Sequence, residues 1–275
     1  MELLAVDVLS LCLLSIAFLF LLVSDDRNGN SGLYFWLNLI LFGSILLIRL
    51  FEIHFLVPLY PLVLIFLLYL QVDVIAENVH GSSSDFEKKV QIWNVRVFGK
   101  LYYLKLPTYL SGRFWRETFG FFYFSYYLLL VIPFLWYGFL SPDPFARFSF
   151  IAVGIFGSFM AIFIWFPVAG PLSKEKVELE RRGFFPKLIY WAYKPVVSNG
   201  INSGAFPSSH VGMSVGLMLL ISPNALWGWL ALGLLTAGIA VSTVYGRFHY
   251  AIDALMGALS GFVLYFLWSA FYSFL

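Results

Sequence analysis

Two histidines in this chain stand where apolar helices are expected to begin. His210 closes the run PSSH at residues 207–210, and His249 opens the last apolar segment with Asp253 four residues later. Residues four apart lie on one face of a helix, so Asp253 can accept the Nδ1 proton of His249 and leave Nε2 as a base or nucleophile. A carboxylate one turn inside an apolar helix is costly, so Asp253 needs such a partner.

Groups suited to binding phosphate lie next to both histidines. A helix amino end presents free N–H groups and partial positive charge. Ser208 and Ser209 add hydroxyl donors there, unless they are only helix caps, and Arg247 adds a guanidinium that matches phosphate oxygens. The set predicts phosphoryl transfer through a phosphohistidine, and it requires no metal or other cofactor. A metal site is the weaker interpretation, because one His–Asp pair and a distant histidine lack the usual ligands.

The composition indicates an integral membrane protein. The 275 residues are 61% hydrophobic and 12% charged, about half the charge of a soluble protein. Apolar runs of the length that crosses a bilayer predict an all-α, polytopic transmembrane bundle of about eight spans. The expected spans are Leu3–Val23, Leu33–Ile48, Phe55–Leu70, Phe119–Leu140, Phe148–Val168, Ser208–Ile221, Ala225–Tyr245 and Ala251–Phe274.

The span that follows the PSSH run is short, about 14 residues, so its amino end is expected to be recessed or shielded by protein. With eight spans, both histidines fall on one face of the membrane. Glycines follow each histidine at helical spacing, and such stripes of small residues let membrane helices approach closely. They are Gly212 and Gly216 after His210, and Gly257 and Gly261 after His249. The two helices are therefore expected to pack together with their histidines adjacent.

The distribution of positive charge indicates which side of the membrane this face occupies. All of the 17 lysines and arginines except Arg49 and Arg147 belong to the loops on the histidine side, chiefly to residues 71–118 and 169–207. The positive-inside rule would place that face in the cytoplasm.

Two further expectations concern polar residues near span ends. Residues 71–118 suggest an interfacial segment with Trp93, Tyr102 and Tyr103 as anchors. Arg49 and Glu52, three residues apart, suggest a local ion pair at the end of a span.

The two histidine motifs resemble those of the type 2 phosphatidic acid phosphatase and vanadium haloperoxidase superfamily. Its patterns are Pro-Ser-Gly-His, and Ser-Arg, five residues, His, three residues, Asp. Here Ser209 replaces the glycine, and Ser242, His249 and Asp253 match while Thr243 replaces the arginine, a charge that Arg247 could supply. This divergence is more similar to the membrane branch of inositol phosphorylceramide and sphingomyelin synthases.

The remaining pattern of the family, Lys, six residues, Arg-Pro, has a partial counterpart. Lys174 and Arg181 match it, and Arg182 stands where the proline is expected. The resemblance covers roughly residues 119–275. It implies two parts, residues 1–118 with N-terminal transmembrane helices and the basic interfacial segment, and residues 119–275 with the catalytic core.

The resemblance implies a mechanism and a substrate class. His249 would attack phosphorus, Asp253 would stabilise the imidazolium, and His210 would protonate the leaving oxygen and then activate the acceptor. Arg247, Ser208, Ser209, Lys174 and Arg181 would hold the phosphate oxygens, and Tyr126 and Tyr127 could border an acyl groove. The prediction is a lipid phosphatase, or alternatively a lipid phosphotransferase that moves a phospho-headgroup to a hydroxyl acceptor, similar to the inositol phosphorylceramide synthases. Its partners would be a membrane lipid phosphate and the bilayer, with no nucleic acid.

Two further alternatives concern location and function. Many members of the family work on the extracytoplasmic or lumenal face, which favours a cell-membrane enzyme with its site outside, whereas the charge distribution favours the cytoplasm. A transporter that uses His and Asp as a proton relay is the other class of function. It is disfavoured because the charged groups lie at helix starts on one face and no second half of the chain repeats them.

Overall fold

The computed structural model describes residues 4–22, 30–80, 85–99, 106–107, 109–171, 182–198, 203–221 and 226–275. This part of the chain is helical and contains no strand, apart from one isolated bridge between Val168 and Gly204. Seven helices are long and apolar enough to cross a membrane. They are α1 (Ala5–Leu22), α2 (Ser31–Leu50), α3 (Tyr60–His80), α6 (Arg113–Leu135, continued by the π-helical turn η2, Trp136–Leu140), α7 (Phe145–Trp165), α11 (Leu226–Tyr245) and α12 (Ala251–Tyr272). The predicted helical membrane bundle is confirmed.

The sixth expected span is a shorter helix, α10 (Ser209–Ile221), of 13 residues. At 1.5 Å per residue it covers about 20 Å, less than the hydrocarbon thickness of about 30 Å. Its amino end is shielded by protein, since Ser208, Ser209 and His210 are all buried. Three other short helices are η1 (His54–Leu56), α4 (Asp85–Phe98) and α9 (Phe184–Ser198).

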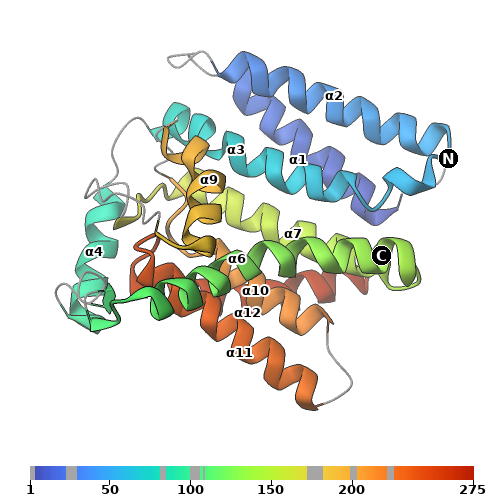
Figure 1. Ribbon diagram of the computed structural model, residues 1–275. Coiled ribbons are helices and arrows are strands. Elements are labelled where there is room, and N and C mark those ends of the chain that lie inside the picture. Colours follow the sequence, from blue (N-terminus) through green and yellow to red (C-terminus); the bar gives the residue numbers. More distant parts are fainter. Residues whose placement is uncertain are drawn as a thin grey trace.

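Helix α7 is the centre of the bundle, and most of its side chains are buried. Helices α1 and α3 pack against it on one side, with α2 covering them, while α10 and α12 contact it on the other side (Figure 1). Helix α6 runs alongside α10 and α11. The amino-terminal helices and the histidine-bearing helices therefore share one hydrophobic core with α7 between them.

The predicted close packing of α10 and α12 is confirmed, and these two helices share the most extensive contact between any two of the described elements. A Cβ atom added at Gly257 would collide with the carbonyl oxygen of Ser208, and one at Gly261 would collide with the backbone of Gly212. Only glycine permits this approach, because the two backbones touch directly. The contact brings the amino ends of both helices together.

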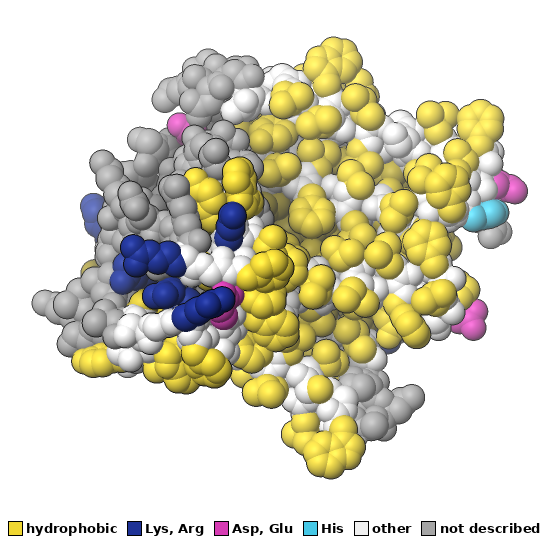
Figure 2. Space-filling model, in the orientation of Figure 1, with side chains coloured by type: hydrophobic (Ala, Val, Ile, Leu, Met, Phe, Trp, Pro, Cys, Tyr) yellow, Lys and Arg dark blue, Asp and Glu magenta, His cyan; other side chains and the backbone are white. Residues whose placement is uncertain are grey.

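The two ends of the bundle differ in charge. Both chain ends lie at one end, while α4, α9 and the starts of α6, α10 and α12 lie at the other (Figure 1). Figure 2 shows dark blue Lys and Arg side chains gathered at this second end, beside a broad hydrophobic surface. The exposed basic residues there are Lys88, Lys89, Arg96, Arg113, Arg182 and Lys187. Both histidine motifs lie at this basic end, as the topology predicts.

Two expectations from the sequence are wrong. Residues 71–80 belong to α3 rather than to an interfacial segment, because Val72, Ile75 and Ala76 continue its buried face, and residues 113–118 belong to α6. Trp93 lies on α4, whereas Tyr102 and Tyr103 lie outside the described residues. Arg49 pairs with Asp7 instead of Glu52, since α2 ends at Leu50 and Glu52 lies beyond it with φ of 53°.

Candidate active site

The segment before α10 is anchored to three other parts of the chain. Val168 exchanges backbone hydrogen bonds with it, donating to the carbonyl of Ser203 and accepting from the N–H of Ala205. The backbone N–H and the hydroxyl of Ser203 both donate to Asp73 on α3. The N–H of Ser208 donates to the carbonyl of Asp253 at 2.9 Å. The PSSH motif is thereby joined directly to the first turn of α12.

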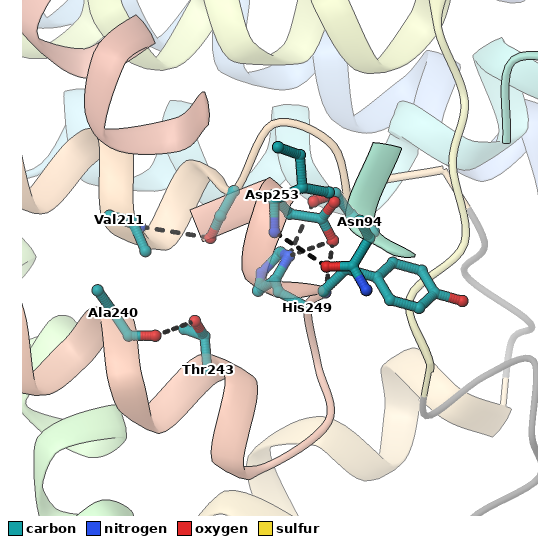
Figure 3. A network of polar contacts seen from close by, with 10 residues as sticks. Asn94, Val211, Ala240, Thr243, His249 and Asp253 are labelled. Carbon is teal, nitrogen blue, oxygen red and sulfur yellow. Dashed lines mark hydrogen bonds and ion pairs between the residues drawn. The ribbon is translucent and has the colours of Figure 1, made fainter. Parts of the chain in front are cut away.

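A tight turn places His249 at the start of α12. The carbonyl of Thr243 accepts the N–H groups of Phe248 and His249, so the chain reverses within five residues of the end of α11. Arg247 adopts a φ of 61° in this turn, a conformation that non-glycine residues rarely take. The hydroxyl of Thr243 donates to the carbonyl of Ala240 in its own helix (Figure 3). Thr243 therefore holds the turn through its carbonyl, while its hydroxyl is bonded within its own helix.

Hydrogen bonding defines the tautomer of His249. Its Nδ1 lies 2.8 Å from the carbonyl oxygen of Ala205. A carbonyl oxygen can only accept, so Nδ1 carries the proton and the lone pair of the neutral imidazole lies on Nε2. His249 is buried, with 4% of its surface exposed. The ring is thus fixed in the form that a nitrogen nucleophile requires.

Asp253 does not accept the Nδ1 proton, contrary to the expectation from its spacing. Its Oδ2 lies 3.8 Å from Nδ1 of His249 and accepts the N–H of Tyr250 at 2.7 Å. The reason is local, because Asp253 is the third residue of α12 and its carboxylate turns back to form a capping box. Its Oδ1 is buried with no hydrogen-bond partner among the described residues. Asp253 can therefore stabilise charge on His249 without setting its tautomer.

Helix α4 supports the start of α12 from outside. Asn94 is buried, and its Oδ1 accepts the N–H of Ile252 at 3.3 Å. Figure 3 shows Asn94 beside His249 and Asp253. Gln91, one turn earlier on α4, donates to the hydroxyl of Tyr250 at 3.4 Å. Helix α4 thus holds the segment that carries the histidine and the carboxylate.

His210 lies in an aromatic enclosure beside His249. The centroids of the two imidazole rings are 5.7 Å apart. Tyr123 of α6 places its hydroxyl 3.3 Å from Nε2 of His210, and the ring of Tyr126 lies 4.4 Å from the imidazole. Nδ1 of His210 is buried with no hydrogen-bond partner in the described part of the chain. The predicted pairing of the two histidines is confirmed.

The residues predicted to bind phosphate fall into three groups. Ser208 and Ser209 lie at the start of α10, where the hydroxyl oxygen of Ser208 accepts the N–H of Val211 at 3.4 Å, so Ser208 caps the helix (Figure 3). Arg247 is partly exposed in the turn before His249, and its side chain forms no ion pair within the described chain. Lys174 and Arg181 lie outside the described residues.

Sequence reasoning missed several contributors to the site. The carbonyl of Ala205 carried no signal, because any residue supplies one. Tyr123 was detectable, since Tyr123, Tyr126 and Tyr127 occur three and four residues apart and so share one face of α6, towards His210. Asn94 is a polar residue in an otherwise amphipathic segment, and nothing local indicates its distant partner.

The fold and the site define a helical membrane protein with two buried histidines and a carboxylate at the amino ends of two closely packed helices. The family model of the PAP2 superfamily matches residues 110–267, more than half of the chain. The chain therefore belongs to the PAP2 superfamily. Members of this family are typically phosphatases or phosphotransferases, which supports an enzyme acting on lipid phosphates. Comparison with curated proteins and with solved structures found no match.

Proposed function

We propose that this protein is a lipid phosphatase that hydrolyses a phosphate monoester of a membrane lipid through a phosphohistidine at Nε2 of His249. The observation that carries the proposal is the 2.8 Å hydrogen bond from Nδ1 of His249 to the carbonyl of Ala205. It leaves the lone pair on Nε2 in a ring whose neighbour is a second histidine.

In the first step, Nε2 of His249 forms a bond to phosphorus as the bond from phosphorus to the lipid oxygen breaks. A protonated His210 donates its proton to that oxygen, so the lipid leaves as an alcohol. The imidazole of His249 now carries positive charge. The carbonyl of Ala205 and the carboxylate of Asp253, 3.8 Å away, stabilise that charge.

In the second step, neutral His210 removes a proton from water as the water oxygen attacks phosphorus. The bond between phosphorus and Nε2 breaks, inorganic phosphate leaves, and His249 returns to its neutral form. His210 is protonated again and ready for the next cycle. The two histidines thus exchange no atoms with each other, and each is regenerated.

Negative charge that builds on the phosphate oxygens during transfer must be stabilised by hydrogen-bond donors or cations at the basic end of the bundle. The amino end of α10, the hydroxyl of Ser209 and the guanidinium of Arg247 are the described groups suited to this role. We include the hydroxyl of Ser208, whose oxygen accepts the N–H of Val211 and whose proton can be donated to phosphate. We propose Lys174 and Arg181 as further cations from their sequence pattern.

A phosphotransferase is the second candidate, and one observation favours it. His210 is only 8% exposed and is enclosed by tyrosines of α6, so the acceptor must pass through an apolar environment. A lipid hydroxyl that enters from the bilayer meets that condition more easily than water does. In this case the second step is the same, with the hydroxyl oxygen of the lipid in place of water.

The experiment is a measurement of phosphate release by purified protein in detergent with excess chelator. The substrates are a panel of phosphatidic acid, prenyl phosphate and sphingoid phosphate, and the phosphoenzyme is trapped with radiolabelled substrate. We expect release together with an acid-labile, alkali-stable phosphoenzyme. Transfer to an added lipid alcohol without release of phosphate would establish the phosphotransferase instead. Absence of both products and of any phosphoenzyme would refute the proposal.

We further propose that the protein resides in the cell membrane with its site on the extracytoplasmic face. Cys12 is exposed, so labelling experiments require a Cys12→Ala background. Lys187→Cys reports on the basic end and Asp143→Cys, also exposed, on the opposite end. We expect an impermeant thiol reagent to label Lys187→Cys in intact cells and to spare Asp143→Cys. The reverse pattern would place the site in the cytoplasm.

A further inference from the structure

An apolar cavity of about 290 Å³ adjoins His210, between α3, α6 and α7. Helix α3 supplies Ile65, Phe66, Tyr69 and Leu70 to its wall, and His210 and Ser209 form its catalytic border. The volume lies near the lower limit of ligand pockets, which span about 300–1,000 Å³. The cavity therefore has the size and lining of a small-ligand site, and it is continuous with the general acid proposed above.

The cavity has a buried floor and a rim that faces lipid. Ile65 and Leu130 are 1% and 2% exposed, whereas Phe66 and Leu70 are 42% and 41% exposed. Phe66 and Leu70 lie on a helix long and apolar enough to cross the membrane, so their exposed surfaces meet hydrocarbon. A ligand can thus enter sideways from the bilayer between α3 and α6.

The neighbouring catalytic group indicates which part of a substrate lies there. His210, which protonates the leaving oxygen in the proposed reaction, borders the cavity, whereas the nucleophile His249 does not. In a lipid phosphate the leaving oxygen carries the hydrocarbon. An apolar site must therefore lie on the His210 side, as this cavity does.

We propose that the cavity between α3 and α6 binds the first part of the substrate's hydrocarbon chain, and that α3 determines which chains the enzyme accepts. This inference rests on the proposed function for the role of His210. Helix α3 lies outside residues 110–267, the part that matches the family model. Helices α6 and α7 of the matched core supply the rest of the wall, so α3 is the part of the cavity that the family match does not cover.

The first test narrows the rim with Leu70→Trp and compares it with Val63→Trp. Val63 is 52% exposed on the same helix and does not line the cavity, so it is a matched control. The probes are dioleoyl and dihexanoyl phosphatidic acid in detergent. We expect the ratio of kcat/KM for the long chain to that for the short chain to fall about tenfold in Leu70→Trp, and less than about twofold in Val63→Trp. Equal ratios in both variants and the wild type would overturn the chain site while leaving the phosphatase intact.

A second measurement does not depend on turnover. Phosphatidic acid with a photoreactive diazirine near the head of one acyl chain is crosslinked to the protein in detergent, and the labelled peptides are identified by mass spectrometry. We expect labelling at residues 65–70 and 126–130, competed by unlabelled phosphatidic acid and reduced in Leu70→Trp but not in Val63→Trp. Labelling that is unaffected by Leu70→Trp would refute the chain site. If the wild type hydrolyses no substrate, the proposed function fails, and crosslinking alone decides whether the chain site stands.

Discussion

The two ends of the bundle each contain a buried cluster with a carboxylate, and the clusters differ in how fully the oxygens of that carboxylate are bonded. At the end near the chain termini, both oxygens of Asp7 are occupied. Oδ1 accepts hydrogen bonds from Nη2 of Arg49 at 3.0 Å and from the hydroxyl of Tyr60. Oδ2 accepts the N–H of Leu4 and lies 2.9 Å from Nε of Arg49 in an ion pair. At the basic end, Oδ1 of Asp253 and Nδ1 of His210 are buried without a hydrogen-bond partner in the described chain.

This difference separates a structural cluster from a reactive one. Buried polar groups are costly unless they are bonded, so the Asp7 cluster has the arrangement expected of groups that join α1, α2 and α3. Unsatisfied groups beside a nucleophile retain capacity for a substrate or a proton. If this distinction is correct, substitutions at the basic end reduce turnover and substitutions at the other end reduce stability.

The largest expected effect on turnover is that of His249→Ala. Removal of the nucleophile should lower kcat by about a thousandfold or more, because the covalent intermediate at Nε2 of His249 can no longer form. The purified variant should elute as a single species with the thermal stability of the wild type, since the ring is held by one hydrogen bond. The measurements are phosphate release and a melting curve from intrinsic fluorescence. A variant that retains wild-type turnover would show that His249 is not the nucleophile.

Asp253→Asn should have the second largest effect. If the carboxylate set the tautomer of His249, its loss would cost about 10⁴-fold, as for orienting carboxylates elsewhere. In this structure the carbonyl of Ala205 accepts the hydrogen bond from Nδ1 of His249 and so keeps the proton on Nδ1. The substitution therefore removes only the negative charge of Asp253, and we expect a decrease in kcat of about a hundredfold. An asparagine oxygen can still accept the N–H of Tyr250, which preserves the cap. A loss near 10⁴-fold would show that Asp253 moves to Nδ1 during turnover.

Tyr123→Phe should have a smaller effect, about fivefold on kcat, because it removes one hydrogen bond to His210 and keeps the ring. The ring of Tyr123 stacks on Phe248 at 4.3 Å, and phenylalanine preserves this contact. Tyr126→Phe is the matched control, since its ring also contacts His210. An equal loss of activity in both variants would show that the hydroxyl of Tyr123 does not position the histidine.

Much of the architecture could be predicted from the sequence, because hydrophobic runs and glycine spacing are local signals. The spans follow from the hydrophobic runs. The contact of α10 with α12 follows from Gly212, Gly257 and the glycines one turn after them. The end of α3 could not be placed, since polar residues after Leu70 share the helix with Val72, Ile75 and Ala76, and only tertiary packing shows that these are buried.

In the candidate site, too, some features could be predicted from the sequence and others could not. The histidines and Asp253 follow from residue type and spacing, and their adjacency follows from topology. The hydrogen-bond partner of Nδ1 of His249 could not be predicted in this way. Spacing suggests Asp253, whereas the folded chain brings the backbone carbonyl of Ala205 closer. For the same reason the spacing of Arg49 and Glu52 suggested a pair, whereas Asp7, distant in sequence, is the partner. Spacing predicts which groups share a helix face, but not which long-range acceptor lies nearest.

The smallest expected effect on turnover, and a large one on stability, is that of Asp7→Asn. The substitution leaves the guanidinium of Arg49, 13% exposed, beside a neutral partner, and breaking a buried pair typically costs about 3–5 kcal/mol. Thermal melting in detergent should therefore shift clearly downwards, while kcat per folded molecule at low temperature stays near that of the wild type. Asp7→Asn combined with Arg49→Met should recover part of the stability, because no unpaired charge remains. A loss of kcat in folded protein would show that the two ends are coupled through α3, which contacts both the Asp7 cluster and the cavity beside His210.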